Sequence, residues 1–504
     1  MQQSKIVKRG RMEAVWTAEI LKRQASNGFW QLILRKIFFQ LIGTFSTIIL
    51  ARVLFPKAFG DFAILVFLIE FLAFLPSQGL SGAIIQKKSK LSDREASTIF
   101  WGINLASILI VLLIFIFAPV IAAFYKDISD GAFLIRLISV AVLAINIRSV
   151  PCAILERQFK YSRLAAIEIL EIFLTQTVSI ILAFSGFGVF SLFAGYLTGK
   201  IFAAFAFFVS VNNFLSLKFS FSKIKQFLPF ALNFQIYHLT YSISGSVAPV
   251  YIGAVLGSTY VGYLTWAGGV GLIPWSMSEL IGRVALPVFS RVQKDKRLFA
   301  RVLERAFDFL AMVTFPLCTL IFVFAPELTE IVYSRQWLPA VGALRLFVVL
   351  GALQSSIFLC TTALLGMGYV KYVRNITLFS GAAFWIFALI LIPKLGFWAQ
   401  PLAWILSTAF LIPTIFKVKK VIKVSYWRSL FVYLLLSMTA VIPVYFLVTV
   451  TGLFSLFLVV SLSLLIYLGL LFIFRRENLR FVWNQWVSVF DSTRAFQFVI
   501  KMLR

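Results

Sequence analysis

The sequence predicts an all-α, polytopic membrane protein with about 14 transmembrane helices. Three observations favour this fold class. Hydrophobic residues make up 61% of the 504-residue chain, only 13% of residues are charged, and the mean hydropathy is +0.95. Apolar runs of helix-spanning length recur along the whole chain, and Lys and Arg gather in every second loop between them. Because each run is apolar throughout, the runs predict helices and not the alternating strands of a transmembrane barrel.

The predicted spans follow one another with short loops between them. The first six cover residues 29–53, 58–76, 98–124, 133–155, 164–184 and 187–209. The next six, after a basic loop, cover residues 227–255, 260–289, 302–324, 343–365, 373–392 and 397–416. Two more cover residues 430–450 and 453–474. Gly271 and Pro274 lie inside the eighth span and are expected to bend or break that helix.

The charge of the chain is distributed by loop. The chain holds 47 Lys and Arg against 19 Asp and Glu, a formal net charge of +28. The N-terminal segment, the even-numbered loops and the tail are basic, whereas the odd-numbered loops hold only Lys57, Lys126, Arg335 and Lys394. Cytoplasmic loops retain Lys and Arg, so we expect a multi-pass protein of the bacterial inner membrane with both termini cytoplasmic. No cleaved signal is expected, and the scattered clusters do not form the single basic face of a nucleic-acid-binding protein.

The first twelve spans form two copies of a six-helix unit. Five short matches recur in order at offsets between 202 and 211 residues, among them the triplets ending in Pro119 and Pro326, and the pair Arg136 and Arg345. A unit with an even number of helices returns the chain to the same side, so the two copies insert in parallel. The predicted parts are a basic interfacial segment (1–28), an N-terminal lobe (29–210), a cytoplasmic linker (211–226), a C-terminal lobe (227–418), helices 13 and 14 (419–474) and an interfacial tail (475–504).

Polar side chains line one face of the first helix and the equivalent face of the seventh. Lys36, Gln40 and Thr44 are spaced four residues apart. When the two copies are aligned at an offset of 202 residues, His238 and Ser242 occupy the positions equivalent to Lys36 and Gln40. We expect both helices to line a wet cavity between the lobes. Polar contacts between packed helices are the alternative, and His238 is either a proton-coupling group or a polar residue that never titrates.

Ionisable residues inside the predicted helices are costly and indicate function. Arg148, Lys200 and Arg283 are cations of this kind, although the first two could also snorkel to the cytoplasmic face. Glu168 and Glu171 lie on the fifth helix, and Glu279 lies four residues before Arg283, where the two can pair. The excess of cations favours an anionic lipid diphosphate as substrate. The candidate substrate-binding residues are Lys36, Gln40, Thr44, Arg148, Lys200, His238, Ser242 and Arg283, and the candidate coupling residues are Glu168, Glu279 and His238.

The sequence holds no recognisable catalytic constellation. It has one His, no phosphate-binding loop, no Gly-x-Ser-x-Gly turn and only three Cys, all in apolar runs. We therefore expect no enzyme, no catalytic residues, no metal and no cofactor.

Several stretches resemble a known family in order and spacing. They are residues 50–54 with 59–60, 79–86, 118–125, 150–159, 252–263, 283–291 and 325–345, and the resemblance covers about residues 51–416. The chain is similar to the bacterial polysaccharide (Wzx-type) flippases of the multidrug/oligosaccharidyl-lipid/polysaccharide exporter superfamily, in particular to the colanic acid exporter-like branch. The resemblance implies fourteen helices in two lobes, alternating access, and transfer of an undecaprenyl-diphosphate-linked oligosaccharide to the periplasmic leaflet. The partners it implies are that glycan lipid, membrane lipids, and the polymerase and other polysaccharide-assembly proteins.

Two departures from the family pattern bear on coupling. Ala248-Pro249 and Ser77 stand where the family often has carboxylates, which argues against ion coupling at those positions. The alternative function is a cation-coupled multidrug or small-solute antiporter of the same superfamily, for which Glu70 or Asp308 would supply the buried carboxylate. A membrane glycosyltransferase or polymerase is disfavoured because the outer loops are short.

Overall fold

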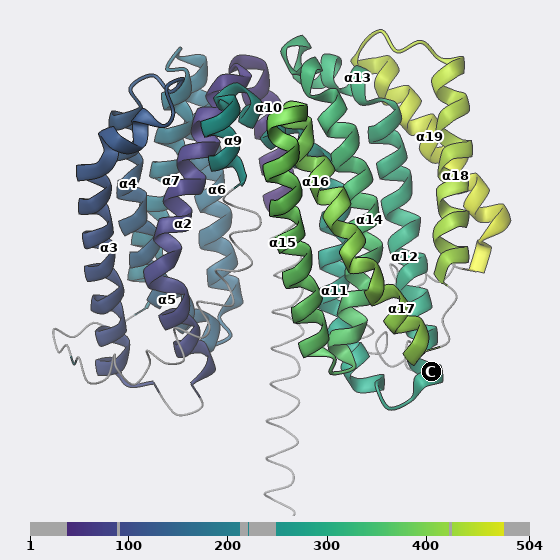
Figure 1. The fold of residues 1–504 in the computed structure, drawn as a ribbon, viewed down its shortest axis with the longest axis horizontal. Helices are drawn as coiled ribbons and strands as arrows, with labels where there is room; N and C mark the ends of the chain where they lie inside the picture. The colour runs from purple at the N-terminus through teal and green to yellow at the C-terminus, as the bar shows by residue number, and fades with distance from the viewer. Residues whose placement is uncertain (1–37, 88–90, 212–219, 221–247, 423–425, 478–504) are drawn as a thin grey trace, which may run out of the picture. The chain divides into compact units, whose positions relative to one another are not determined.

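Helices make up almost all of the computed structural model, which describes residues 38–87, 91–211, 220, 248–422 and 426–477 (Figure 1). No strand occurs within those residues. Ten of the described segments are long and apolar enough to cross a membrane, and the described part of the first predicted span adds the shorter apolar helix Phe38–Val53. The predicted all-α, multi-pass membrane fold is confirmed.

The chain divides into two compact units after Ser258. Besides Phe38–Val53, the helices of the first unit are α2 (Pro56–Gln86), α3 (Asp93–Ala123), α4 (Gly131–Ile147), α5 (Ser149–Arg157), α6 (Tyr161–Phe184), α7 (Val189–Val209) and α9 (Ala248–Leu256). The second unit comprises α10 (Ser258–Gly271, from Thr259), α11 (Ile273–Val292), α12 (Lys296–Val323), α13 (Ala325–Leu328), α14 (Val341–Gly366), α15 (Val370–Leu395), α16 (Ala399–Thr408), α17 (Ile412–Val421), α18 (Tyr426–Leu447) and α19 (Leu453–Phe474). The predicted spans at 58–76, 98–124 and 453–474 each correspond to one helix, namely α2, α3 and α19.

Two predicted spans are broken in the structure. The eighth is interrupted at Leu272, between α10 and α11, with Pro274 in the first turn of α11, as expected from its glycines and proline. The fourth, expected as one continuous helix over residues 133–155, is interrupted at Arg148, between α4 and α5. Pro151 has no N–H to donate to the carbonyl of Ile147, so the regular helical ladder loses a bond there.

In each unit an arginine of one long helix donates to a backbone carbonyl of the long helix before it. In the first unit Arg136 Nε donates to the Phe115 carbonyl, 3.2 Å away, and in the second Arg345 Nε donates to the Phe322 carbonyl, 3.1 Å away. Each carbonyl lies four residues before a proline, Pro119 or Pro326. Pro119 lies inside α3 and has no N–H, so Arg136 supplies the missing donor there. Phe322 lies in the last turn of α12, where carbonyls have no helical donor, and Arg345 supplies one.

The surfaces of the helices are suited to lipid. On α3 the side chains of Leu105, Leu109 and Ile116 are between 56% and 67% exposed, while Ile99 and Ile103 of the same helix are fully buried. The second unit buries its own core, which includes Phe289, Phe307 and Leu364 from α11, α12 and α14. Large apolar side chains therefore cover the outside as well as the inside, as in a protein whose solvent is hydrocarbon.

Helix α9 packs on α2 and so belongs to the first unit. Gly253 leaves no room for a side chain beside Ile64, and the Tyr125 hydroxyl donates to the Val250 carbonyl at 3.3 Å. Tyr125 lies between α3 and α4, where burial raises its pKa to about 12, so this hydroxyl remains a donor throughout the physiological pH range. The predicted N-terminal lobe ended at residue 210; the first compact unit also includes α9.

Candidate functional site

Three charged side chains of the first unit meet within its transmembrane segments. Glu171 of α6 accepts a hydrogen bond from Arg148 Nη1 through its Oε2 atom, and from Lys200 Nζ of α7 through its Oε1 atom at 3.0 Å. The side chains are 9% exposed for Glu171, 23% for Arg148 and 16% for Lys200. Each carboxylate oxygen therefore holds one cation, and each cation keeps part of its surface accessible. We call Arg148, Glu171 and Lys200 the charged triad.

Local sequence explains how the triad is positioned. Gly195 and Gly199 lie four residues apart on the buried face of α7, a small-residue spacing typical of close helix pairs in membranes. A Cβ added at Gly199 would lie 3.0 Å from the Glu171 backbone oxygen, and one at Gly195 would lie 2.9 Å from the Ser179 backbone nitrogen. The two glycines thus let α7 approach α6 closely enough for Lys200 to reach Glu171.

A second polar contact supports Lys200. Its ammonium group lies 5.0 Å from the centre of the Tyr196 ring, one helical turn earlier on α7. The Tyr196 hydroxyl in turn donates to Glu70 Oε1 of α2 at 2.9 Å. Glu168 of α6 and Cys152 of α5 are also close enough to interact electrostatically with Arg148. The polar network thus draws on α2, α6 and α7 and on the break between α4 and α5.

The structure brings together two of the predicted substrate cations, Arg148 and Lys200, through a carboxylate that was not among the predicted site residues. Both of these cations, for which snorkelling to the cytoplasmic face was the alternative, pair with Glu171. The signal that could have identified Glu171 is the Gly195 and Gly199 spacing just before Lys200, because it indicates a close neighbour for that face of α7.

Three other predicted site residues and one predicted coupling residue are described, on two further helices. Gln40 and Thr44 are half-buried on the helix Phe38–Val53, where the Gln40 amide donates to the Thr44 hydroxyl at 3.3 Å. Arg283 is exposed and Glu279 half-buried, both on α11 of the second unit. Lys36, His238 and Ser242 lie outside the described residues.

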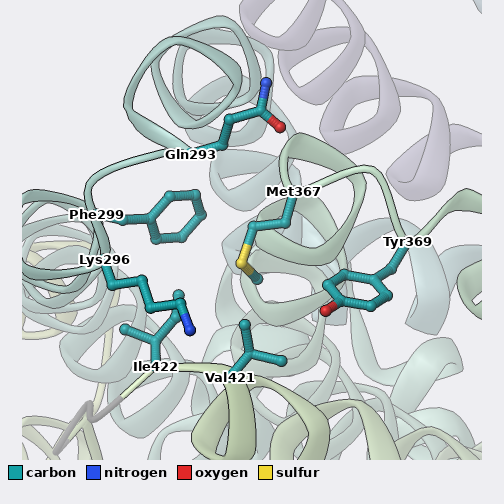
Figure 2. Close-up of a pocket in the computed structure, with 7 residues that line it drawn as sticks. All are labelled: Gln293, Lys296, Phe299, Met367, Tyr369, Val421 and Ile422. Atoms are coloured by element: carbon teal, nitrogen blue, oxygen red, sulfur yellow. The ribbon is translucent and has the colours of Figure 1, made fainter.

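The second unit has a surface hollow of about 180 Å³ that contains none of the predicted site residues. It is lined by Gln293, Lys296, Phe299, Met367, Tyr369, Val421 and Ile422. Figure 2 shows the Lys296 ammonium group and the Tyr369 hydroxyl facing the hollow from opposite sides, with Met367 between them. A further cation, Lys417 Nζ, lies 5.2 Å from the centre of the Tyr369 ring. The lining of the hollow thus combines apolar side chains with one cation, Lys296, and a second cation lies beside one of its lining residues.

Among the described residues, no group of three or more His, Cys, Asp or Glu side chains is arranged to hold a metal ion. The charged triad suits a different task. A guanidinium and an ammonium group held side by side can bind the oxygens of a phosphate group.

Comparison with known proteins gives one family and several relatives. A family model described as "Polysaccharide biosynthesis protein" matches residues 49–342. A Klebsiella pneumoniae protein described as "Uncharacterized membrane protein in cps region" is 26% identical over 327 residues, which are 62% of this chain and 65% of that protein. The succinoglycan biosynthesis transport protein ExoT of Rhizobium meliloti (strain 1021) is 22% identical over 303 residues, 59% of this chain and 61% of that protein. The chain therefore spans less than two thirds of the length of these relatives.

Among solved structures, the lipid II flippase MurJ in its inward closed conformation has a similar fold. The TM-score is 0.75 at 17% sequence identity, and the match covers 88% of this chain and 98% of that one. At this identity the likeness shows the fold alone.

Proposed function

This chain belongs to the polysaccharide biosynthesis protein family, and from that premise we propose that it is a flippase for a lipid-linked oligosaccharide. The substrate is an undecaprenyl-diphosphate-linked polysaccharide repeat unit, moved from the cytoplasmic to the periplasmic leaflet of the bacterial inner membrane by alternating access between two lobes. Two relatives support this proposal by their names, a membrane protein in a cps region and a succinoglycan biosynthesis transport protein. So does the fold it shares with a lipid II flippase.

The observation that carries the proposal is the charged triad. A cation inside a membrane-spanning segment costs at least a few kcal/mol unless it is paired, and here two cations, Arg148 and Lys200, share one carboxylate. Taken by itself the triad therefore carries a net charge of +1, and Glu168 lies close enough to Arg148 to interact with it electrostatically. A lipid diphosphate supplies several anionic oxygens, and arginine recognises them through two parallel hydrogen bonds.

The remaining assignments follow from this function. Both termini lie in the cytoplasm, because the basic loops and tail are retained there. Membrane lipids surround the helices, and the polymerase and other polysaccharide-assembly proteins receive the translocated unit. Lys36, His238, Ser242 and Arg283 complete the cationic and polar lining, with Glu168 and Glu279 as coupling groups.

The direct test is deletion of the gene in a strain without paralogues. We expect lipid-linked repeat units to accumulate on the cytoplasmic leaflet and polymer export to stop, as measured by leaflet-selective labelling of the glycan. Reintroduction of the wild-type gene should restore export. Unchanged polymer export in the deletion strain would contradict the proposal.

A second candidate function is a cation-coupled multidrug or small-solute antiporter. The observation that favours it is Asp308 of α12, whose Oδ1 atom is buried without a hydrogen-bond partner among the described residues. An unsatisfied carboxylate oxygen is suited to a proton or a small cation. This function predicts that overexpression lowers drug sensitivity and that Asp308→Asn abolishes the effect. Wild-type overexpression without any change in drug sensitivity would exclude it.

A further inference from the structure

The carboxylate of Glu171 stands where an anionic ligand of Arg148 and Lys200 would stand. We propose that Glu171 is an internal counter-anion. It pairs with the two cations in the unloaded protein, is displaced from them by the diphosphate of the substrate, and pairs with them again after the substrate is released. Glu171 would thereby set the affinity for the headgroup. This inference rests on the proposed flippase function and assigns to Glu171 the control of substrate affinity.

The geometry supports this exchange because both carboxylate oxygens are in use. Oε2 accepts from the Arg148 guanidinium and Oε1 accepts from Lys200 Nζ, so the carboxylate bridges the cations as two oxygens of a phosphate group would. Glu171 is the least exposed member of the triad, at 9%, whereas the cations keep 16% and 23% exposure. The accessible surface of the triad is therefore mainly cationic.

The chemistry of the two anions favours exchange. A diphosphate carries more negative charge than a carboxylate and offers more acceptor oxygens, so it competes effectively for an arginine and a lysine. Without Glu171 the two cations would lose the carboxylate that they share whenever the substrate had left, and only Glu168 would remain near Arg148, which is costly inside a membrane. A site that conducts its ligand must also bind weakly enough to let it leave. Competition from Glu171 satisfies both requirements.

The surroundings hold the cations in place while the carboxylate exchanges. Lys200 rests on the Tyr196 ring, and Tyr196 is tied to Glu70 by its hydroxyl. The turn between α4 and α5, where the helix is interrupted, carries Arg148. These contacts do not involve Glu171, so they can persist when the substrate replaces it.

The test measures binding of undecaprenyl diphosphate to the full chain in lipid nanodiscs, with undecaprenyl monophosphate for comparison. Glu171→Gln keeps the size of the side chain and removes its charge. We expect it to bind the diphosphate about tenfold more tightly than wild type, because one charge-assisted competitor is lost. The monophosphate should gain less, and export in cells should fall because release slows.

The matched control is Glu330→Gln. Glu330 also accepts a hydrogen bond from an arginine, Arg335 at 2.6 Å, but this pair is exposed, at 42% and 85%, and lies outside the triad. It should leave diphosphate affinity unchanged. Adding Lys200→Met to Glu171→Gln should abolish the gain in affinity, since the released cation is then missing.

The outcomes separate the inference from the proposed function. If wild type binds undecaprenyl diphosphate but Glu171→Gln binds it no more tightly, the counter-anion role is wrong and the flippase function stands. If wild type binds no diphosphate and the deletion strain exports polymer normally, the function itself fails. If Glu171→Gln does not insert into the membrane, the same binding measurement is made on Glu171→Asp. Its shorter carboxylate cannot pair with both cations, so a gain in diphosphate affinity smaller than tenfold supports the counter-anion role. No gain in affinity overturns it.

Discussion

At Glu171 one carboxylate compensates two cations that come from different helices. Removing one member of such a cluster leaves the others without full compensation in a medium of low dielectric constant, and that loss exceeds the value of an exposed ion pair. The same argument separates Glu171 from Glu330, whose partner Arg335 is 85% exposed and can be solvated when the pair is broken. Residues of identical type thus differ in importance because their surroundings differ.

At the residue scale we predict that Lys200→Met destabilises the purified protein by about 2 kcal/mol, below the range for fully buried pairs because Lys200 keeps 16% exposure. A double-mutant cycle with Glu171→Gln should give a coupling energy of about 1 kcal/mol or more. Thermal unfolding in detergent measures both. Additive effects of the two substitutions would show that the pair has no energetic role.

At the scale of helices, close packing and helix breaks place the charged groups. Gly195 and Gly199 bring α7 against α6, and the break at Arg148 turns the chain between α4 and α5. In each unit an arginine of the next long helix donates to a helix carbonyl that has no helical donor, because of Pro119 in α3 and because α12 ends at Val323. These features depend on single residues in otherwise apolar helices.

Gly199→Val tests the helix contact. The added side chain would meet the Glu171 backbone and Thr175, so α6 and α7 must separate and the Lys200–Glu171 pair weakens. We predict loss of export and a lower unfolding temperature. Gly469→Val on α19, where a Cβ would meet nothing within 4 Å, is the matched control and should behave as wild type. Full export from Gly199→Val would show that close packing is not required.

Arg136→Ala tests the proline-arginine contact. It leaves the Phe115 carbonyl of α3 without a donor and should cost about 1 kcal/mol in unfolding free energy. Adding Pro119→Ala restores a backbone N–H four residues after Phe115, within the same helix, so the double variant should regain most of the lost stability. Thermal unfolding of the single and double variants measures this. A double variant less stable than Arg136→Ala would argue against the explanation.

At the scale of the whole molecule, the chain is a membrane protein of two units, each with its own core and with apolar side chains on its outside. The proposed orientation can be tested with single cysteines at Lys294, between α11 and α12, and at Lys126, between α3 and α4. In a background with Cys152→Ser, we predict that a membrane-impermeant thiol reagent labels intact cells at position 126 and not at 294. The reverse pattern would invert the topology.

Most of the architecture could be predicted from the sequence because it depends on local properties. Spanning lipid requires long apolar runs. These indicated α19 to the residue, whereas the predicted α2 ended ten residues early and the predicted α3 began five residues late. The break before α11 followed from Gly271 and Pro274. The site was only partly predictable: Arg148, Lys200, Glu168 and Glu171 stood out as ionisable residues in apolar helices, but their spacing did not indicate which carboxylate the two cations share.

The sequence by itself determined the membrane class and the approximate positions of the long apolar helices, since both follow from composition and spacing along the chain. Only the tertiary structure decided that Glu171, and not Glu168 one turn earlier, holds both cations. Helical periodicity assigns a residue to a face, but the partner of that face depends on how each helix is rotated and how closely it packs. Here that distance is set by two glycines of α7 against the backbone of α6.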